Sequence, residues 1–469
     1  MLETEHAQVD LIITDYYGNT ASTGRVEVPG KSKLITLPEL APGYYEINVE
    51  RRGVTVTKTA MAIITPYDFD GVPYAESDFG VCTHLERSGG SGWSFDLLNE
   101  ISAMGAKFIR DDLEWRGAEN PKGVYTFKFD EGKTLLDEKD MGFLHTSGFN
   151  NQHYDGGATP YTAEGQDGFA NYVAAAKDYI GDRYMAVDVF NEFWGPEFGD
   201  RGDGPADSLP EYYVPLHKKT YDVMKAAYPE VLVLANFARD EANPDKPTLG
   251  WYEETLKLGV ADYMDGIFIH PYYGRTYPPE TRIPLAYTNT INSLHGRYNV
   301  TGKLIWATET GSNTTNVTEK EQAQFVPRSY ALFKHYGIEK VAWYDFMDDG
   351  TDPLSQEHNF GFIRNKFNEV YGAYTPKPSY VAYAVMARKL TGLHYSAGST
   401  AAGVYHYTFT GTDGKRVDMV WATTAAVKEI ITSNTLTVTD IMGVSKQYTP
   451  LDGKVTLQAT QDVLYIEGI

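Results

Sequence analysis

Two short apolar runs decide the fold of this 469-residue chain. They are Val187-Asp188-Val189-Phe190-Asn191-Glu192-Phe193 and Leu304-Ile305-Trp306-Ala307-Thr308-Glu309-Thr310-Gly311, and each carries one glutamate near its end. A short run of mostly apolar residues is typical of a strand buried on both faces of a parallel sheet. Each run therefore predicts a parallel strand with Glu192 or Glu309 at its carboxyl end, where α/β barrels place their active sites.

The same alternation of apolar strand and helix-period stretch repeats from about residue 78 to residue 392. Helix-period stretches lie, for example, at 95–104, 212–227 and 320–335, and Thr318 with Glu321 forms a capping box before the last of these. Eight alternating units over roughly 310 residues fit a (β/α)8 TIM barrel. The eight predicted strands are 79–84, 107–110, 143–147, 185–192, 231–237, 266–272, 303–309 and 341–346.

A doubly wound open sheet is the alternative architecture. Such a sheet normally carries a glycine-rich phosphate turn with GxGxxG spacing after its first strand. The segment Gly89-Gly90-Ser91-Gly92 lies near that place but lacks the spacing. We therefore interpret it as a flexible loop and favour the closed barrel.

Short strands with alternating apolar and polar residues flank the barrel on both sides. Turn signals such as Pro42-Gly43 separate those before it, and a hairpin at Asp413-Gly414 joins predicted strands 404–409 and 416–422 after it. We expect three domains: an N-terminal β-sandwich (1–66), a (β/α)8 catalytic barrel (67–392) and a small C-terminal β-domain (393–469).

The composition excludes several classes of function. With 41 Lys and Arg against 63 Asp and Glu, the net charge of −22 disfavours nucleic acid and anionic membranes as partners. Cys82 is the only cysteine, so neither an internal disulfide nor a cysteine metal cage can form. No run reaches the roughly 20 apolar residues that span a bilayer. We expect a soluble protein, secreted or periplasmic after loss of a signal peptide, with a cytoplasmic location as the alternative.

Strand alternation makes a specific prediction about the two glutamates. Residues two apart on a regular strand share a face, so Ala307 and Glu309 are expected to point together, as are Asp188 and Glu192. Asn191 then reaches the barrel mouth only if the strand end twists or bulges. Asp188 lies two residues deeper than Glu192 and is interpreted as a buried, paired charge.

The order of motifs along the chain resembles that of the retaining glycoside hydrolases of clan A, above all family 39 and its relatives. The resemblance covers about residues 70–392. The motifs are Phe108-Ile109-Arg110, Trp115 with the segment 119–127, Asn191-Glu192, His270-Pro271-Tyr272, Thr308-Glu309-Thr310 and Trp343. It implies that Glu192 is the general acid/base and Glu309 the nucleophile, with their carboxyl groups about 5 to 5.5 Å apart.

The resemblance also implies roles for the residues around the glutamates. Arg110 and Tyr272 would keep Glu309 ionised, and His270 would orient its neighbours. Asn191 would bind the sugar 2-hydroxyl, and Trp343 would form an aromatic floor for the ring. The alternatives are structural: a barrel ion pair for Arg110, a satisfied core histidine for His270 and barrel filling for Trp343.

Other candidates rest on position alone. His84 and His145 fall near predicted strand ends and are expected to line the pocket, and the loop from Trp194 to Leu209 is expected to wall one side of it. The acidic loops 200–204 and 348–352 lack EF-hand spacing, so we interpret them as solvated loops and expect no metal.

We conclude from the sequence that the chain is a retaining glycoside hydrolase. Its expected substrate is a β-linked oligo- or polysaccharide, of β-xyloside, β-glucoside or microbial exopolysaccharide type, and it needs no cofactor. A noncatalytic carbohydrate-binding barrel and a transglycosylase are the alternatives. The sequence makes no prediction of sugar identity, oligomeric state or exo against endo action.

Overall fold

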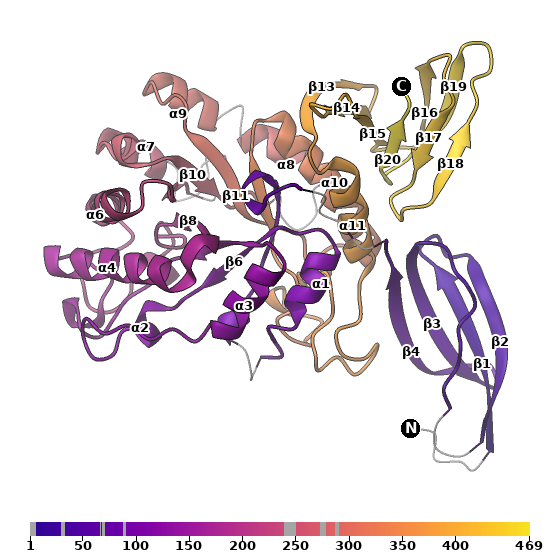
Figure 1. The fold of residues 1–469 in the computed structure, drawn as a ribbon, viewed down its shortest axis with the longest axis horizontal. Coiled ribbons are helices and arrows are strands. Elements are labelled where there is room, and N and C mark those ends of the chain that lie inside the picture. The colour runs from indigo at the N-terminus through magenta and orange to yellow at the C-terminus, as the bar shows by residue number, and fades with distance from the viewer. Residues whose placement is uncertain are drawn as a thin grey trace.

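A closed barrel of eight parallel strands forms the centre of the computed structural model (Figure 1). The strands hydrogen-bond in the order β10-β11-β12-β5-β6-β7-β8-β9, so the predicted TIM barrel is confirmed and the open sheet is excluded. All eight predicted strands are present. Their bounds are β5 Phe79–Cys82, β6 Phe108–Asp112, β7 Gly142–Thr146, β8 Tyr184–Asp188, β9 Leu232–Asn236, β10 Gly266–Ile269, β11 Leu304–Thr310 and β12 Lys340–Trp343.

Helices surround the barrel strands. The structure describes residues 6–29, 33–65, 67, 71–87, 91–238, 250–272, 278–286 and 290–469. The predicted capping box of α10 is present, because Thr318 Oγ1 accepts from Glu321 N and the Glu321 carboxylate accepts from Thr318 N. The helices are α1 Leu97–Ala103, α2 Trp115–Ala118, α3 Asp130–Glu138, α4 Ala163–Ile180, α5 Pro196–Gly199, α6 Pro210–Ala227, α7 Trp251–Lys257, α8 Pro279–Ala286, α9 Asn292–Arg297, α10 Glu319–His335 and α11 Pro378–Leu390.

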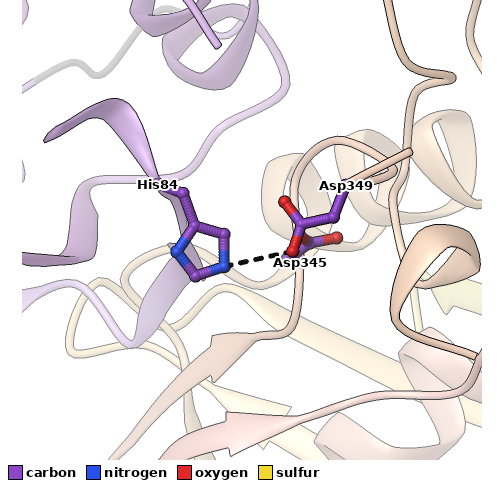
Figure 2. Close-up of side chains that lie close together, drawn as sticks. All are labelled: His84, Asp345 and Asp349. Atoms are coloured by element: carbon purple, nitrogen blue, oxygen red, sulfur yellow. Dashed lines mark ion pairs between the residues drawn. The ribbon is translucent and has the colours of Figure 1, made fainter. Parts of the chain in front are cut away.

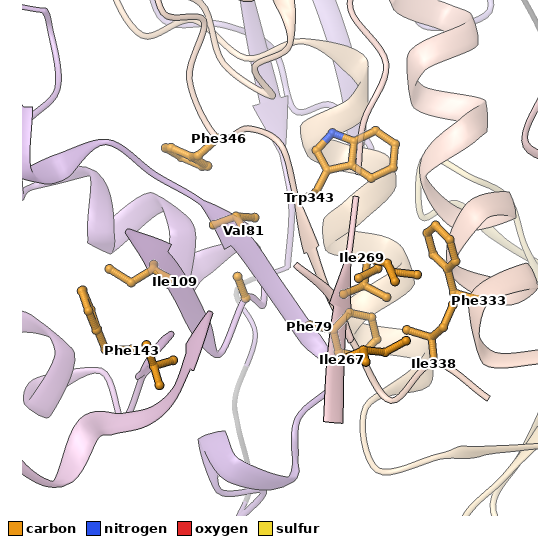
Figure 3. Packing of buried hydrophobic residues seen from close by; sticks show 14 of the residues in the cluster. Phe79, Val81, Ile109, Phe143, Ile267, Ile269, Phe333, Ile338, Trp343 and Phe346 are labelled. Carbon is orange, nitrogen blue, oxygen red and sulfur yellow. The ribbon is translucent and has the colours of Figure 1, made fainter. Parts of the chain in front are cut away.

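Strand alternation divides the barrel side chains into two apolar clusters. The inner cluster fills the barrel and contains Cys82, Phe108, Leu144, Ala186, Leu234, Phe268, Trp306 and Ala342. The outer cluster packs the strands against the helices, as Figure 3 shows for Phe79, Val81, Ile109, Phe143 and their neighbours. Because the inner cluster occupies the barrel interior, the polar site can form only beyond it, at one end of the strands.

The N-terminal segment differs from the expected β-sandwich. Its described residues form one four-stranded antiparallel sheet in the order β2-β1-β3-β4, with bounds β1 His6–Asp15, β2 Thr20–Pro29, β3 Gly43–Arg51 and β4 Val54–Ile63. The expected second sheet is replaced on one face by Ile35, Leu37 and Leu40, which pack against Leu11 and Ile47. Alternation of apolar and polar residues predicts that one face of the sheet is buried, but it does not predict which segment covers that face.

The C-terminal segment is a small all-β domain, as predicted. A six-stranded sheet has the order β13-β14-β15-β20-β17-β18, and β16 pairs with β19. The expected hairpin joins β14 and β15. The strands are β13 His394–Ala401, β14 Val404–Thr410, β15 Arg416–Ala422, β16 Ala426–Ile431, β17 Leu436–Thr439, β18 Ser445–Tyr448, β19 Lys454–Ala459 and β20 Leu464–Glu467.

Both β-domains pack against the same side of the barrel, next to α10 and α11 (Figure 1). Tyr16 and Tyr44 of the N-terminal sheet share a buried cluster with Val381 of α11 and with Met442 of the C-terminal domain. Tyr16 Oη also donates to Asp462 at 2.8 Å. No helix in the described part of the chain is both long and apolar enough to cross a bilayer.

Candidate active site

Glu309 reaches the carboxyl end of the barrel because β11 is irregular. The register between β11 and β12 shifts between Ala307 and Thr310. Ala307 belongs to the outer cluster, whereas Glu309 lies among polar groups at the barrel mouth. The expectation that Ala307 and Glu309 share a face is therefore wrong, because the irregularity moves the glutamate to the other face.

Glu192 lies on a tight turn beyond β8 and not on the strand itself. The strand ends at Asp188, and Phe190 and Glu192 both have positive φ angles, +62° and +45°. Ser147 holds this turn, since its Oγ and carbonyl oxygen accept from Phe190 N and Asn191 N. The prediction that Asp188 and Glu192 share a strand face is wrong, but the predicted departure from strand geometry at Asn191 is found. Positive φ at two non-glycine residues costs free energy, which is typical of functional turns.

The turn and the bulge bring the two carboxylates together. One oxygen of Glu192, one of Glu309 and one ring nitrogen of His270 all lie within 4.8 Å of one another. His270 Nδ1 is 2.7 Å from Glu192 Oε1 and 3.5 Å from Glu309 Oε2. The two glutamate side chains are only 11% and 13% exposed, so water screens them little.

Glu309 is held in its ionised form. Arg110 Nη1 donates to its Oε1 at 2.6 Å and Tyr272 Oη donates to its Oε2 at 2.9 Å. Burial alone raises the pKa of this carboxyl, but the charges of His270 and Arg110 and the two hydrogen bonds outweigh it and lower the pKa to about 2. Arg110 and Tyr272 therefore lie where they were predicted, against Glu309.

Arg110 also connects Glu309 to the β8 turn. Its Nε donates to Asp188 Oδ2 at 2.8 Å and its Nη2 donates to Asn191 Oδ1 at 2.8 Å. Asp188 is fully buried, which confirms its interpretation as a paired core charge. A single guanidinium thus fixes the positions of Asp188, Asn191 and Glu309 relative to one another.

Trp343 does not form the predicted aromatic floor. Trp343 is buried in the outer cluster, stacked on Phe362 with ring centroids 5.7 Å apart, on the helix side of β12 (Figure 3). The prediction that Trp343 contacts the substrate is therefore wrong. The next residue, Tyr344, points to the opposite face, and its ring lies edge-on to Tyr272 and Phe360, at 6.3 and 5.3 Å.

The two other histidines that were predicted to line the pocket, His84 and His145, have different surroundings. His145 lies on the outer face of β7, where its ring nitrogens contact Tyr184 Oη and Tyr172 Oη at 2.8 and 2.9 Å. Burial lowers its pKa to about 3, so it is a neutral structural residue and the expectation that it lines the pocket is wrong. His84 lies beside the site, with Nε2 3.3 Å from Tyr344 Oη. Trp194 is partly buried against the outer cluster, and its substrate contact stays a prediction.

Two groups of described side chains are close enough to hold a metal ion. The first is Glu192, His270 and Glu309, and the second is His84, Asp345 and Asp349. The first group is already paired with protein donors. The second adjoins the acidic loop 348–352, which is not simply solvated as expected: Asp348 is buried and its Oδ1 accepts from Lys377 Nζ at 2.6 Å.

Sequence reasoning missed Tyr344 and Asp345, and it interpreted the loop that contains Asp349 as solvated. A signal for Tyr344 was available, because Val341 and Trp343 alternate with Ala342 in the same way that Phe79 and Val81 alternate with Gly80. That pattern places Trp343 on the helix side and Tyr344 at the mouth. No comparable signal marks Asp345, because its burial depends on the loop that follows β12.

Comparison with solved structures agrees with this architecture. A family 39 glycoside hydrolase from the gut symbiont Bacteroides cellulosilyticus matches with a TM-score of 0.79 and 24% identity, over 100% of this chain and 95% of that one. An endo-β1,6-glucanase matches at 0.57 with 14% identity, covering 98% of both chains. The family 30 xylanase C catalytic domain from Talaromyces cellulolyticus matches at 0.55 with 14% identity, over 87% and 99%. No family model and no curated protein matches.

These likenesses show that the chain has the fold of structurally known glycoside hydrolases, with a TIM barrel at its centre. The fold predicted from the motifs, including its likeness to family 39, is therefore confirmed.

Replacing Arg110 tests its place at the centre of the site. Arg110→Met should lower the free energy of unfolding by about 3 kcal/mol or more, because it leaves buried carboxylates without their cation. The matched control is Arg87→Met, since Arg87 is 53% exposed and lies 3.6 Å from Asp112; it should cost below about 1 kcal/mol. Urea denaturation at pH 7 measures both, and equal losses would contradict the assignment.

Proposed function

We propose that this protein is a retaining glycoside hydrolase that acts on a β-linked oligo- or polysaccharide. The observation that carries the proposal is the approach of Glu192 and Glu309 to within 4.8 Å at the carboxyl end of the barrel. Retaining enzymes hold their two carboxyl groups about 5 to 5.5 Å apart, whereas inverting enzymes leave about 6.5 to 9.5 Å for a water. The short separation favours direct attack by one carboxylate.

Glu309 is the nucleophile in this proposal. Its pKa of about 2 makes it a carboxylate at any working pH, and Tyr272 and Arg110 fix both of its oxygens. It attacks the anomeric carbon as the bond to the leaving oxygen breaks, and a covalent glycosyl-enzyme forms. Attack also removes the negative charge that Glu309 presents to the surrounding site.

Glu192 is the general acid and then the general base. It protonates the leaving oxygen in the first step and takes a proton from the attacking water in the second. The 2.7 Å contact with His270 Nδ1 holds the Glu192 carboxyl group in place through both steps. Thr308 Oγ1, 3.3 Å from His270 Nε2, partners the other ring nitrogen.

The remaining site residues are suited to hold a sugar. Asn191 presents its carbonyl oxygen to Arg110, which leaves its amide nitrogen to donate to a 2-hydroxyl. Tyr344 and Tyr272 offer the aromatic surface that was expected from Trp343. Among the substrate classes suggested by the motifs, xylans and β-glucans are also the polymers named for the similar structures, so both enter the first trials.

A panel of aryl β-glycosides tests the proposal directly. The wild-type protein should release dye from at least one member, and Glu309→Gln should lower kcat by about 1,000-fold or more because the nucleophile is lost. Sugar binding without dye release from any substrate would instead identify a noncatalytic carbohydrate-binding barrel. Sugar transfer that dominates in the presence of an added acceptor would identify a transglycosylase.

Glu192→Ala tests the acid role. Loss of the proton donor should slow substrates with poor leaving groups far more than activated aryl glycosides, because the latter need little protonation. Added azide should restore turnover of activated substrates by occupying the space of the missing carboxylate. Steady-state kinetics on a leaving-group series measures this, and equal losses across the series would exclude Glu192 as the acid.

Tyr272→Phe tests whether the Tyr272 hydroxyl keeps Glu309 ionised. The lost hydrogen bond stabilises the ionised carboxylate, so its removal should raise the pKa of Glu309 above about 2. Activity requires the ionised form, so the acid limb of kcat/KM should move to higher pH. Tyr344→Phe is the matched control, since the hydroxyl of Tyr344 contacts His84 and not Glu309; an equal shift in both variants would contradict the account.

A further inference from the structure

A second cluster of polar side chains lies beside the catalytic glutamates. His84 follows β5, Asp345 and Asp349 follow β12, and these two strands are neighbours in the barrel. Figure 2 shows the His84 ring facing the two aspartates, and one ligand atom of each residue lies within 4.8 Å of the others. His84 Nε2 is 3.5 Å from Asp349 Oδ2. The mechanism proposed above uses none of these three groups.

Asp345 is the unusual member of the cluster. Its side chain is fully buried, and among the described residues neither of its carboxylate oxygens has a hydrogen-bond partner. Its neighbour Asp348 is also buried, but its carboxylate accepts from Lys377 Nζ and from Gly361 N. A buried carboxylate without a partner costs several kcal/mol, so Asp345 requires either a proton or a cation.

The surrounding charges make a cation the suitable partner. The negative charges of Asp349 and Asp348 act on Asp345, and Lys377, the cation that opposes them, is already paired with Asp348. A metal ion binds the neutral imidazole of a histidine such as His84, whose ring nitrogen donates its lone pair. Asp349 is oriented toward the cluster by Trp93 Nε1, which donates to its other oxygen at 3.0 Å.

We propose that His84, Asp345 and Asp349 bind one divalent metal ion of the class that takes imidazole and carboxylate ligands, with Zn²⁺ as the first probe. The 3.5 Å between His84 Nε2 and Asp349 Oδ2 is close to the spacing of two ligands on one tetrahedral ion with bonds of about 2.0 to 2.2 Å. An imidazole ligand favours Zn²⁺ over Ca²⁺ and Mg²⁺.

The ion would have a positioning role and no chemical role. His84 Nε2 also lies 3.3 Å from Tyr344 Oη, and Tyr344 packs edge-on against Tyr272, which holds Glu309. Binding at His84 would therefore fix the segment after β12 and, through it, one side of the active site. This consequence rests on the proposed function, whereas the metal site itself does not.

The test uses the full chain after treatment with EDTA and return to metal-free buffer. Titration with Zn²⁺ in a calorimeter, with bound metal counted by mass spectrometry, should give one equivalent and a melting temperature raised by about 2 °C or more. Asp345→Asn and Asp349→Asn preserve the shape of the side chain but remove its charge. Each should weaken Zn²⁺ binding by about 100-fold or more, because loss of a residue that only supports a metal ligand already costs about 10- to 100-fold. Glu309→Gln should still bind one equivalent of Zn²⁺, because Glu309 belongs to the other group of side chains that is close enough to hold a metal ion.

Three results would overturn the site. The first is a wild-type protein that binds none of Zn²⁺, Mn²⁺ or Ca²⁺ above background. The second is binding that survives both aspartate variants but is lost in Glu309→Gln, which would place the ion on the catalytic glutamates. The third is absence of metal binding together with a raised KM for the sugar in Asp349→Asn, which would assign the cluster to the substrate. The first two results do not depend on the glycosidase proposal being correct.

Discussion

The three contacts of the Arg110 guanidinium are the constraint on which the site depends. One planar cation, almost fully buried, donates to Asp188 at the end of β8, to Asn191 on the following turn and to Glu309 at the end of β11. Because β8 and β11 are not neighbours in the barrel, backbone hydrogen bonds alone cannot set the distance between their ends. Arg110 sets that distance and also supplies the charge that keeps Glu309 ionised.

Departures from regular strand geometry turn this scaffold into a site. A strictly regular β11 would direct Glu309 to the outer face with Ala307, and a strictly regular β8 would continue past Asp188 and carry Glu192 along the barrel wall. The shift in β11 and the positive φ angles at Phe190 and Glu192 redirect both carboxylates to one place. The free energy that such conformations cost is offset by the ion pairs and hydrogen bonds that the redirected groups make.

The barrel could be predicted from the sequence because its signals are local. Each strand is a short apolar run, and helix-period stretches separate the runs, so all eight strands were found within a few residues. The residues in contact with Glu309 followed from motif order. Trp343 was predicted at the barrel mouth in place of Tyr344, although strand alternation indicated the reverse. The outward position of His145 and the single sheet of the described N-terminal residues were not predicted, because each depends on which surface packs against which. The burial of Asp345 is of the same kind, since it depends on the loop that follows β12.

The central claim is that Glu309 forms a covalent bond to the sugar while Glu192 handles the proton. An activated 2-deoxy-2-fluoro β-glycoside of the sugar that the protein hydrolyses traps such an intermediate, because the fluorine slows its breakdown more than its formation. Digestion of the inactivated protein and mass spectrometry should find one fluorosugar on the peptide that contains Glu309. A label on any other residue, or hydrolysis that inverts the anomeric configuration and leaves no label, would contradict the account.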